Sequence, residues 1–283
     1  TCDNPTIGLG TGGISNIPAF TAINTGTTPV VATVTVTPVL PGKFAYITNY
    51  IDHSVSVIEI PSHTVVATVP VGDSPFGVCV HPDGSKVYVA NQGSNTVSVI
   101  NTATNTVGAT ISVGNAPVGV CISRDGTRAF VTNSADGTVS VINTVTNTIL
   151  ATIPVGVSPG GIAISPDGSR VYVANSSSHN VLVINTITNS IIATIGTGAN
   201  PAGVVVSPSG SRAYVANFGS KNVSVINTAT NTVLTNVGVG DGPSGISIAP
   251  NGGRVYVSNN TPSTVSVINT ATNTVVATIP ASN

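Results

Sequence analysis

The chain has 283 residues, of which only 6% are charged, and its formal net charge at pH 7 is -1. A typical soluble protein has about a quarter charged residues, so solubility here must depend on uncharged Asn, Thr and Ser side chains. Lys and Arg provide most of the affinity for nucleic acids and anionic membranes, so the lack of a basic cluster argues against both as partners. No apolar run approaches the length of a membrane-spanning helix, so we expect no membrane insertion.

Residues 1–30 come first and differ from the rest of the chain. Their last part, with the following residues, reads FTAINTGTTPVVATVTV and echoes INTATNTVVATIP near the C-terminus, but lies seven residues too close to the next unit. One interpretation is an N-terminal tail on a six-bladed ring; the other is a seventh, incomplete blade of two or three strands. An incomplete blade leaves an unpaired strand edge, and such edges recruit strands from other chains. We therefore hypothesise that this strand-forming extension donates or accepts a strand between subunits.

Cys2 lies in the same extension and has no evident partner within the chain. An odd cysteine near the end of an exterior protein is a candidate for an intermolecular disulfide, with a free thiol as the alternative.

A repeat of 42 residues runs from residue 31 to the C-terminus, with a degenerate first unit. Residues 115–156 show its content: the runs GVCIS, AFVTN, TVSVIN and ILATIPV are separated by turn residues, as four strands require. Four strands in about 42 residues is the size of one propeller blade, and no helix is available to cover the faces of the sheets. The sequence therefore predicts an all-β fold, with a β-propeller domain of six four-stranded blades over residues 31–283.

Two positions of the second strand recur in every unit, and we assign structural roles to both. An Asn ends the strand, where its amide can bond to nearby backbone. An aromatic ring lies three residues earlier, where filling the core between blades is a better explanation than a ligand cage. These residues are Asn49, Asn91, Asn133, Asn175, Asn217 and Asn259, and Tyr46, Tyr88, Phe130, Tyr172, Tyr214 and Tyr256.

The segments VYVAN, AYITN and AFVTN, preceded by SPDGSR and followed by VSVINTATNTVVATIP, resemble the YVTN family of β-propeller repeats. This family occurs in bacterial and archaeal surface-layer and cell-surface proteins. The resemblance covers residues 41–283 and extends over the whole unit. It implies a toroidal propeller on a cell surface and no particular ligand.

Catalytic, cofactor and metal sites are not expected. Related propellers with redox cofactors or lactonase activity use converging His, Glu, Asp or Arg at the central channel, whereas this chain has one glutamate, Glu59. Cys79 and Cys121 are one repeat apart, so they should lie too far from each other for a disulfide and remain free and buried. The histidines show no metal-ligand spacing; they are His53, His63, His81 and His179.

One cation per unit recurs at the start of the second strand, three residues after an Asp in several units. The preferred interpretation is an exposed ion pair at the end of a hairpin, and the alternative is a ring of positive charge that attracts an anionic glycan. The cations are Lys86, Arg128, Arg170, Arg212 and Arg254, and the acids are Asp83, Asp125 and Asp167. Three formal N-glycosylation sequons begin at Asn175, Asn222 and Asn259, of which Asn222, expected in a loop, is the best candidate.

The absence of Met and Trp and the scarcity of Lys suit an extracellular protein. The leading hypothesis is a non-enzymatic structural or adhesive protein of the cell surface that self-assembles into a layer or filament. The alternative is a binding propeller that recognises a carbohydrate or protein through its channel or a loop rim. Loops between second and third strands vary most between units, so a binding site is expected there.

Overall fold

The computed structural model describes residues 44–281, which lie within one compact unit, Lys43–Asn283. The N-terminal extension, Cys2 and the domain boundary expected after residue 30 lie outside the described residues. No helix in the described part is long and apolar enough to cross a membrane.

The described residues form 23 β-strands in six antiparallel sheets, each a simple meander. Blades 1 to 3 are β1 (Phe44–Asn49), β2 (Ser54–Glu59), β3 (Thr64–Pro70); β4 (Pro75–Val80), β5 (Lys86–Asn91), β6 (Thr96–Asn101), β7 (Thr106–Ser112); and β8 (Pro117–Ile122), β9 (Arg128–Asn133), β10 (Thr138–Asn143), β11 (Thr148–Pro154). Blades 4 to 6 are β12 (Pro159–Ile164), β13 (Arg170–Asn175), β14 (Asn180–Asn185), β15 (Ile191–Gly196); β16 (Pro201–Val206), β17 (Arg212–Asn217), β18 (Asn222–Asn227), β19 (Thr232–Gly238); and β20 (Asp241–Ile248), β21 (Arg254–Thr261), β22 (Thr264–Asn269), β23 (Thr274–Pro280).

This architecture confirms the predicted propeller with six blades. Blade 1 shows three strands, because the sequence that is in register with an innermost strand falls before residue 44, outside the described part.

The turn between the third and fourth strands shows how the repeat encodes local structure. The Asn101 side-chain oxygen accepts the N–H of Ala103 at 2.9 Å and of Thr104 at 3.3 Å. Asn105 then adopts a φ of 52°, in the left-handed region that Asn tolerates better than most residues. The N-T-x-T-N sequence therefore specifies a tight turn, and its recurrence places the outer strand of blades 2 to 6; blade 1 has EIPSH at residues 59–63 instead.

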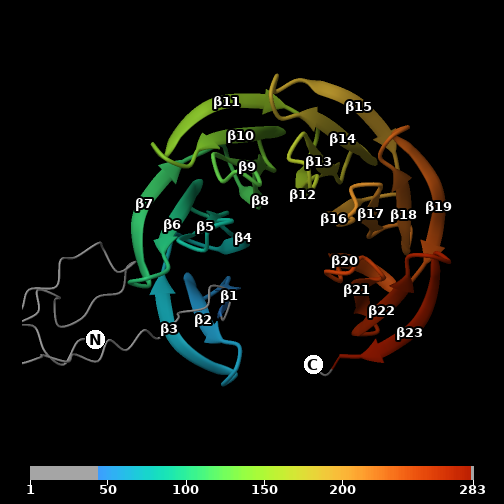
Figure 1. The fold of residues 1–283 in the computed structure, drawn as a ribbon, viewed down its shortest axis with the longest axis horizontal. Coiled ribbons are helices and arrows are strands. Elements are labelled where there is room, and N and C mark those ends of the chain that lie inside the picture. Colours follow the sequence, from blue (N-terminus) through green and yellow to red (C-terminus); the bar gives the residue numbers. More distant parts are fainter. Residues whose placement is uncertain (1–43, 282–283) are drawn as a thin grey trace, which may run out of the picture. The chain divides into compact units, whose positions relative to one another are not determined.

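The blades surround a common axis, with the innermost strands β4, β8, β12, β16 and β20 nearest to it and the outermost strands on the perimeter (Figure 1). The hydrophobic core lies between blades rather than within one sheet. Tyr172 and Val183 of blade 4, for example, share a buried cluster with Val204 and Val215 of blade 5. Each of blades 2 to 5 thus buries both of its faces against neighbouring blades, as the sequence indicated.

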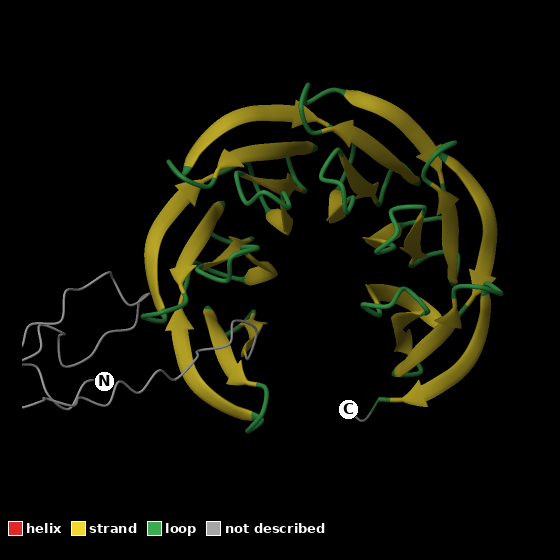
Figure 2. Cartoon of the chain, in the orientation of Figure 1, coloured by secondary structure: helices red, strands yellow, loops and turns green. Residues whose placement is uncertain are grey.

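The ring of blades is open between blade 6 and blade 1 (Figure 2). Packing connects each blade to the next from blade 1 to blade 6, but no strand pair of blades 6 and 1 packs together substantially among residues 44–281. The blades next to this opening consequently have one face without a neighbouring blade of the described chain.

Candidate functional site

The Asn that ends each second strand fastens this strand to the third strand. Asn91 is fully buried, and its Nδ2 donates to Thr96 Oγ1 at 3.0 Å and to Ser98 Oγ at 2.9 Å. The equivalents in blades 3 to 6 are also buried, and Asn49 in blade 1 is partly exposed. A buried amide whose N–H groups bond to the next strand holds two strands of one blade together.

The aromatic series is buried except beside the opening. Tyr88, Phe130, Tyr172 and Tyr214 are at most 1% exposed, Tyr46 is partly exposed, and Tyr256 is 41% exposed. Tyr256 therefore departs from the expected core position, because no described blade covers this face of β21.

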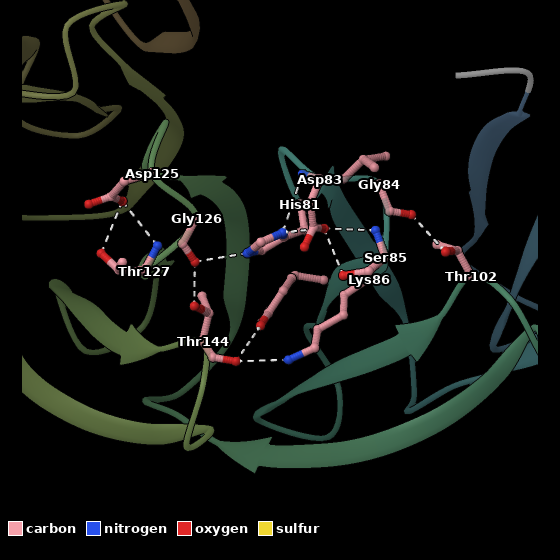
Figure 3. A network of polar contacts seen from close by, with 12 residues as sticks. His81, Asp83, Gly84, Ser85, Lys86, Thr102, Asp125, Gly126, Thr127 and Thr144 are labelled. Carbon is pink, nitrogen blue, oxygen red and sulfur yellow. Dashed lines mark hydrogen bonds and ion pairs between the residues drawn. The ribbon is translucent and has the colours of Figure 1, made fainter. Parts of the chain in front are cut away.

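The recurrent cations join neighbouring blades, which corrects the expected ion pair with the turn aspartates. Lys86 Nζ donates to the carbonyl oxygen of Thr144 in the next blade at 3.0 Å (Figure 3). Arg170 repeats this contact with Thr228 at 2.6 Å, and Arg128 and Arg212 do so with Thr186 and Thr270. We call this contact the inter-blade clasp. Because its cations are already bonded to backbone, they are poorly suited to form a ring that attracts anions.

The turn aspartates bond to hydroxyl and backbone groups of their own turn. Asp83 accepts from the side chain and the N–H of Ser85, at 2.7 and 2.8 Å, and lies 2.6 Å from His81 Nδ1 (Figure 3). The Ser85 hydrogen bonds lower the pKa of Asp83 to about 2. Hydrogen bonds from Ser165 and then from Ser169 lower the pKa of Asp167 to about 2. Both carboxylates therefore stay ionised at neutral pH and stabilise turns; they are unsuited to act as general acids.

A depression of about 450 Å³ lies at the end of the blades that carries these turns. Its lining combines Arg124 and Asp167 with several serine hydroxyls, including Ser169 and Ser209. The loop rim expected to bind ligands, between second and third strands, lies at the other end of the blades. Hydroxyl, guanidinium and carboxylate groups around a shallow depression can hydrogen-bond to a polar ligand such as a sugar.

Two histidines occupy one register position of the loops between second and third strands. His53 Nδ1 accepts the N–H of Ser74 at 3.0 Å, and His179 Nδ1 accepts that of Asn200 at 3.1 Å. Asn95 takes this role in blade 2 by accepting the N–H of Ala116 at 2.9 Å. Spacing of multiples of 42 residues could have revealed this shared role from the sequence.

Within residues 44–281, no three His, Cys, Asp or Glu side chains gather as metal ligands. Cys79 and Cys121 are free thiols. Burial raises the pKa of Cys79 to about 11 and that of Cys121 well above its ordinary value. Both thiols therefore remain protonated and weakly nucleophilic.

The sequons differ in accessibility. The side chains of Asn175 and Asn259 are buried, and the Nδ2 of Asn175 donates to the carbonyl oxygen of Val155 at 2.8 Å. Glycosylation of either would remove a buried amide from its partners, so neither is an accessible acceptor in the folded protein. Asn222 is partly exposed and is the first residue of β18 rather than a loop residue.

The outermost strands carry apolar side chains that face solvent, a feature that the sequence analysis missed. One position of the outermost strand has a Val, Leu or Ile in five blades, and these side chains are 45–51% exposed. Blade 2 has Gly108 at this position. We call this set the perimeter belt; it consists of Val66, Leu150, Ile192, Leu234 and Val276. Sequence alternation predicts which residues share a face, but not that this face lies on the outside of a ring.

Residues 125–239 match the family model described as "Lactonase, 7-bladed beta-propeller". No curated protein matches the chain. Among solved structures, hydrazine synthase of Kuenenia stuttgartiensis is 24% identical, with a TM-score of 0.77 over 85% of this chain and 84% of that chain. A functionally unknown protein from Desulfotomaculum acetoxidans DSM 771 is 22% identical, with a TM-score of 0.76 over 84% and 80%. At these identities the likeness shows a shared fold, so the chain is a β-propeller similar in part to the lactonase family.

Proposed function

We propose that this protein is a non-enzymatic structural or adhesive protein of the cell exterior that assembles with copies of itself into a layer or filament. The perimeter belt is the observation that carries this proposal. Five of six blades present a half-exposed Val, Leu or Ile at the same position. Repeated apolar groups on one surface favour association, because burying them removes apolar area from water.

The small number of charges supports the same function. Soluble monomers are kept apart partly by net charge, and this chain has 6% charged residues and a net charge of -1. Electrostatic repulsion between copies is therefore weak.

The YVTN resemblance supports placement on a cell surface. The proposal that the protein is non-enzymatic is supported by the contacts of its charged residues. The turn aspartates hydrogen-bond within their turns, and the clasp cations hydrogen-bond to backbone of the next blade. The sole glutamate, Glu59, accepts from the hydroxyl of Ser62 at 2.7 Å on the surface.

Substitution of the belt tests the proposal. The wild-type protein should form particles much larger than one chain in light scattering, and layers or filaments in negative-stain micrographs. In the double variant Leu150→Lys and Ile192→Lys, two charges would have to be buried at the contact, so lateral association should fall sharply. Val157→Lys, at a loop residue that is 60% exposed outside the belt, is the matched control. Wild-type protein that stays monomeric at all concentrations would refute the proposal.

A second candidate function is carbohydrate binding, favoured by the depression lined by Arg124, Asp167 and serine hydroxyls. Calorimetric titration with neutral and acidic oligosaccharides tests it. Binding that is lost in Ser209→Leu would favour this function, whereas no heat with any sugar would remove it.

A further inference from the structure

The open face of blade 6 has the form of a contact surface without its partner. On β21, Tyr256 and Ser258 are exposed, whereas their equivalents Tyr214 and Ala216 on β17 are buried by the next blade. A partner that covers this ring would remove its apolar surface from water. This exposure lies at the opening and is separate from the perimeter belt.

The inter-blade clasp is also incomplete at this face. In the clasps of blades 2 to 5, the acceptor lies 58 residues after the cation, for example Thr270 after Arg212. No residue in the described part of the chain accepts the equivalent contact from Arg254. The Arg254 guanidinium instead donates to the carbonyl oxygen of the adjacent Gly253 at 2.9 Å.

A third sign of the missing partner lies on the innermost strands. A Cβ added to Gly161 would lie 2.3 Å from the carbonyl oxygen of Ala202, and one added to Gly203 would lie 2.5 Å from that of Ser244. The innermost strands of successive blades therefore approach each other closely. Among residues 44–281, a Cβ added to Gly245 of blade 6 would meet Ser258 of its own blade and no atom of another blade.

The sequence contains one further copy of the strand pair that would fit this face. Ile23-Asn24-Thr25 repeats Ile268-Asn269-Thr270, and VVATV at residues 30–34 repeats VVATI at residues 275–279. In this alignment Thr25 corresponds to Thr270, the residue whose carbonyl oxygen accepts the clasp from Arg212. Residues 20–36 therefore include a candidate acceptor for Arg254.

The spacing after this segment argues against donation within one chain. Fifteen residues join the end of the outer strand to the cation that begins the next second strand, for example between Ser112 and Arg128. Eight residues join position 35, which corresponds to Pro280, to Phe44. In the described blades, these fifteen residues run from the end of the outer strand, along an innermost strand, to the start of the next second strand at the opposite end of the blade. Eight extended residues span about 29 Å at most, which is roughly half of what fifteen residues can span in the described blades.

We propose that residues 20–36 of a second copy occupy the open face of blade 6, with the Thr25 carbonyl oxygen accepting the clasp from Arg254. This inference rests on the proposed self-assembly and names the segment responsible for it. Each copy provides one donor segment and one open face on blade 6, so the contact joins different surfaces of the two copies and is head-to-tail. Contacts of this kind produce open chains unless the rotation closes a ring. Donation therefore explains a filament, and the perimeter belt explains association between filaments.

Cross-linking between two differently tagged variants tests which segment occupies the face. One variant carries Thr25→Cys and the other Gly253→Cys, both with Cys2→Ser, and a short bismaleimide joins cysteines that lie close together. Gly253 neighbours Arg254 and leaves the clasp intact. We expect a cross-linked pair containing both tags. Ser211→Cys, at the same register position in blade 5, is the matched control and should form no such pair.

A third variant carrying both Thr25→Cys and Gly253→Cys identifies the source of the segment. A link within single chains, without links between tagged variants, would show that each chain fills its own opening; it would overturn the inference but leave self-assembly standing. Large assemblies without any link to position 253 would overturn it in the same way. A wild-type protein that never assembles would overturn the proposed function and this inference together.

Two further variants measure the contribution of the contact to assembly. Deletion of residues 1–36 should abolish filaments while circular dichroism still reports β-structure, and it leaves the perimeter belt unchanged. Arg254→Gln should raise the concentration needed for half-maximal assembly about tenfold, since a hydrogen bond from a charged donor is lost. Val157→Lys, at an exposed loop residue outside both the contact and the perimeter belt, should have no effect. Filaments that persist after the deletion would contradict the inference.

Discussion

Blades 5 and 6 have nearly the same sequence pattern but different environments. Tyr214 in blade 5 is buried, and the equivalent Tyr256 in blade 6 is 41% exposed. Arg212 reaches a carbonyl oxygen in the next blade, whereas among the described residues Arg254 reaches that of its neighbour Gly253. The difference shows that a blade acquires its core from the next blade. In such a repeat architecture, stability is approximately a sum of repeat terms and nearest-neighbour interface terms.

Removing an aromatic ring should change the free energy of unfolding much more in a blade covered by the next blade than in blade 6, and this difference should be the largest of those predicted. Tyr172→Ala empties a site enclosed by two blades and should lower the free energy of unfolding by about 3–5 kcal/mol. Tyr256→Ala should cost much less in dilute monomer, because this ring is partly in water already. Denaturant titrations of both variants measure the difference, and equal losses would break the comparison.

Crowding the inner strands should have the next largest effect. Gly161→Ala places a methyl group 2.3 Å from the carbonyl oxygen of Ala202, so the backbone must move, at a cost of about 1–3 kcal/mol. Among the described residues, the methyl group of Gly245→Ala meets the Ser258 hydroxyl, the end of a side chain that can shift more easily than backbone. Thermal unfolding should show a lower Tm for the first variant only. A similar drop in both would mean that Gly245 is constrained by something other than a neighbouring blade.

Loss of one inter-blade clasp should have a smaller effect. Arg170→Gln removes a charge-assisted hydrogen bond to the Thr228 carbonyl oxygen and should cost about 1.5–3 kcal/mol. The same substitution at Arg254 should leave the stability of the monomer nearly unchanged. If Arg254→Gln destabilised the monomer equally, Arg254 would have a partner within its own chain.

Acid should slightly reduce the stability that the turns of blades 2 and 4 contribute. Asp83 and Asp167 have pKa values of about 2, below the ordinary 3.8, because of hydrogen bonds from serines in their turns. A lowered pKa gives stability that is present above the unfolded pKa and lost as the pH falls from about 4 to about 2. The matching turn of blade 6 has the neutral Asn251. Unfolding midpoints at pH 5 and pH 2 should differ less in Asp83→Asn/Asp167→Asn than in the wild type.

Much of the fold could be predicted because the repeat carries its own turn chemistry. The N-T-x-T-N turn and the Asn after each second strand act within one blade, so their partners lie close in sequence. The inter-blade clasp could not be predicted from the sequence, because its acceptor is a backbone carbonyl oxygen 58 residues away that no side-chain pattern marks. The ion-pair prediction failed because it paired Lys86 with Asp83 through proximity in sequence alone.

Exposure was harder to predict than strand position. Tyr256 lies in VYVSN, which differs by one residue from the VYVAN around the buried Tyr172, and the described residues provide no blade that covers it. The perimeter belt was missed for the same reason: Leu150 and Ile192 alternate as core residues do, but their strands lie on the outside of the ring (Figure 1).

Hydrogen exchange of β21 and β22 tests most directly whether a neighbouring blade confers stability, with β17 and β18 as the internal reference. In dilute monomer, amides of β21 and β22 should exchange faster than those of β17 and β18. In the assembled protein they should become equally protected, and deletion of residues 1–36 should prevent this gain. Equal protection of the two strand pairs in monomer and assembly would contradict the account.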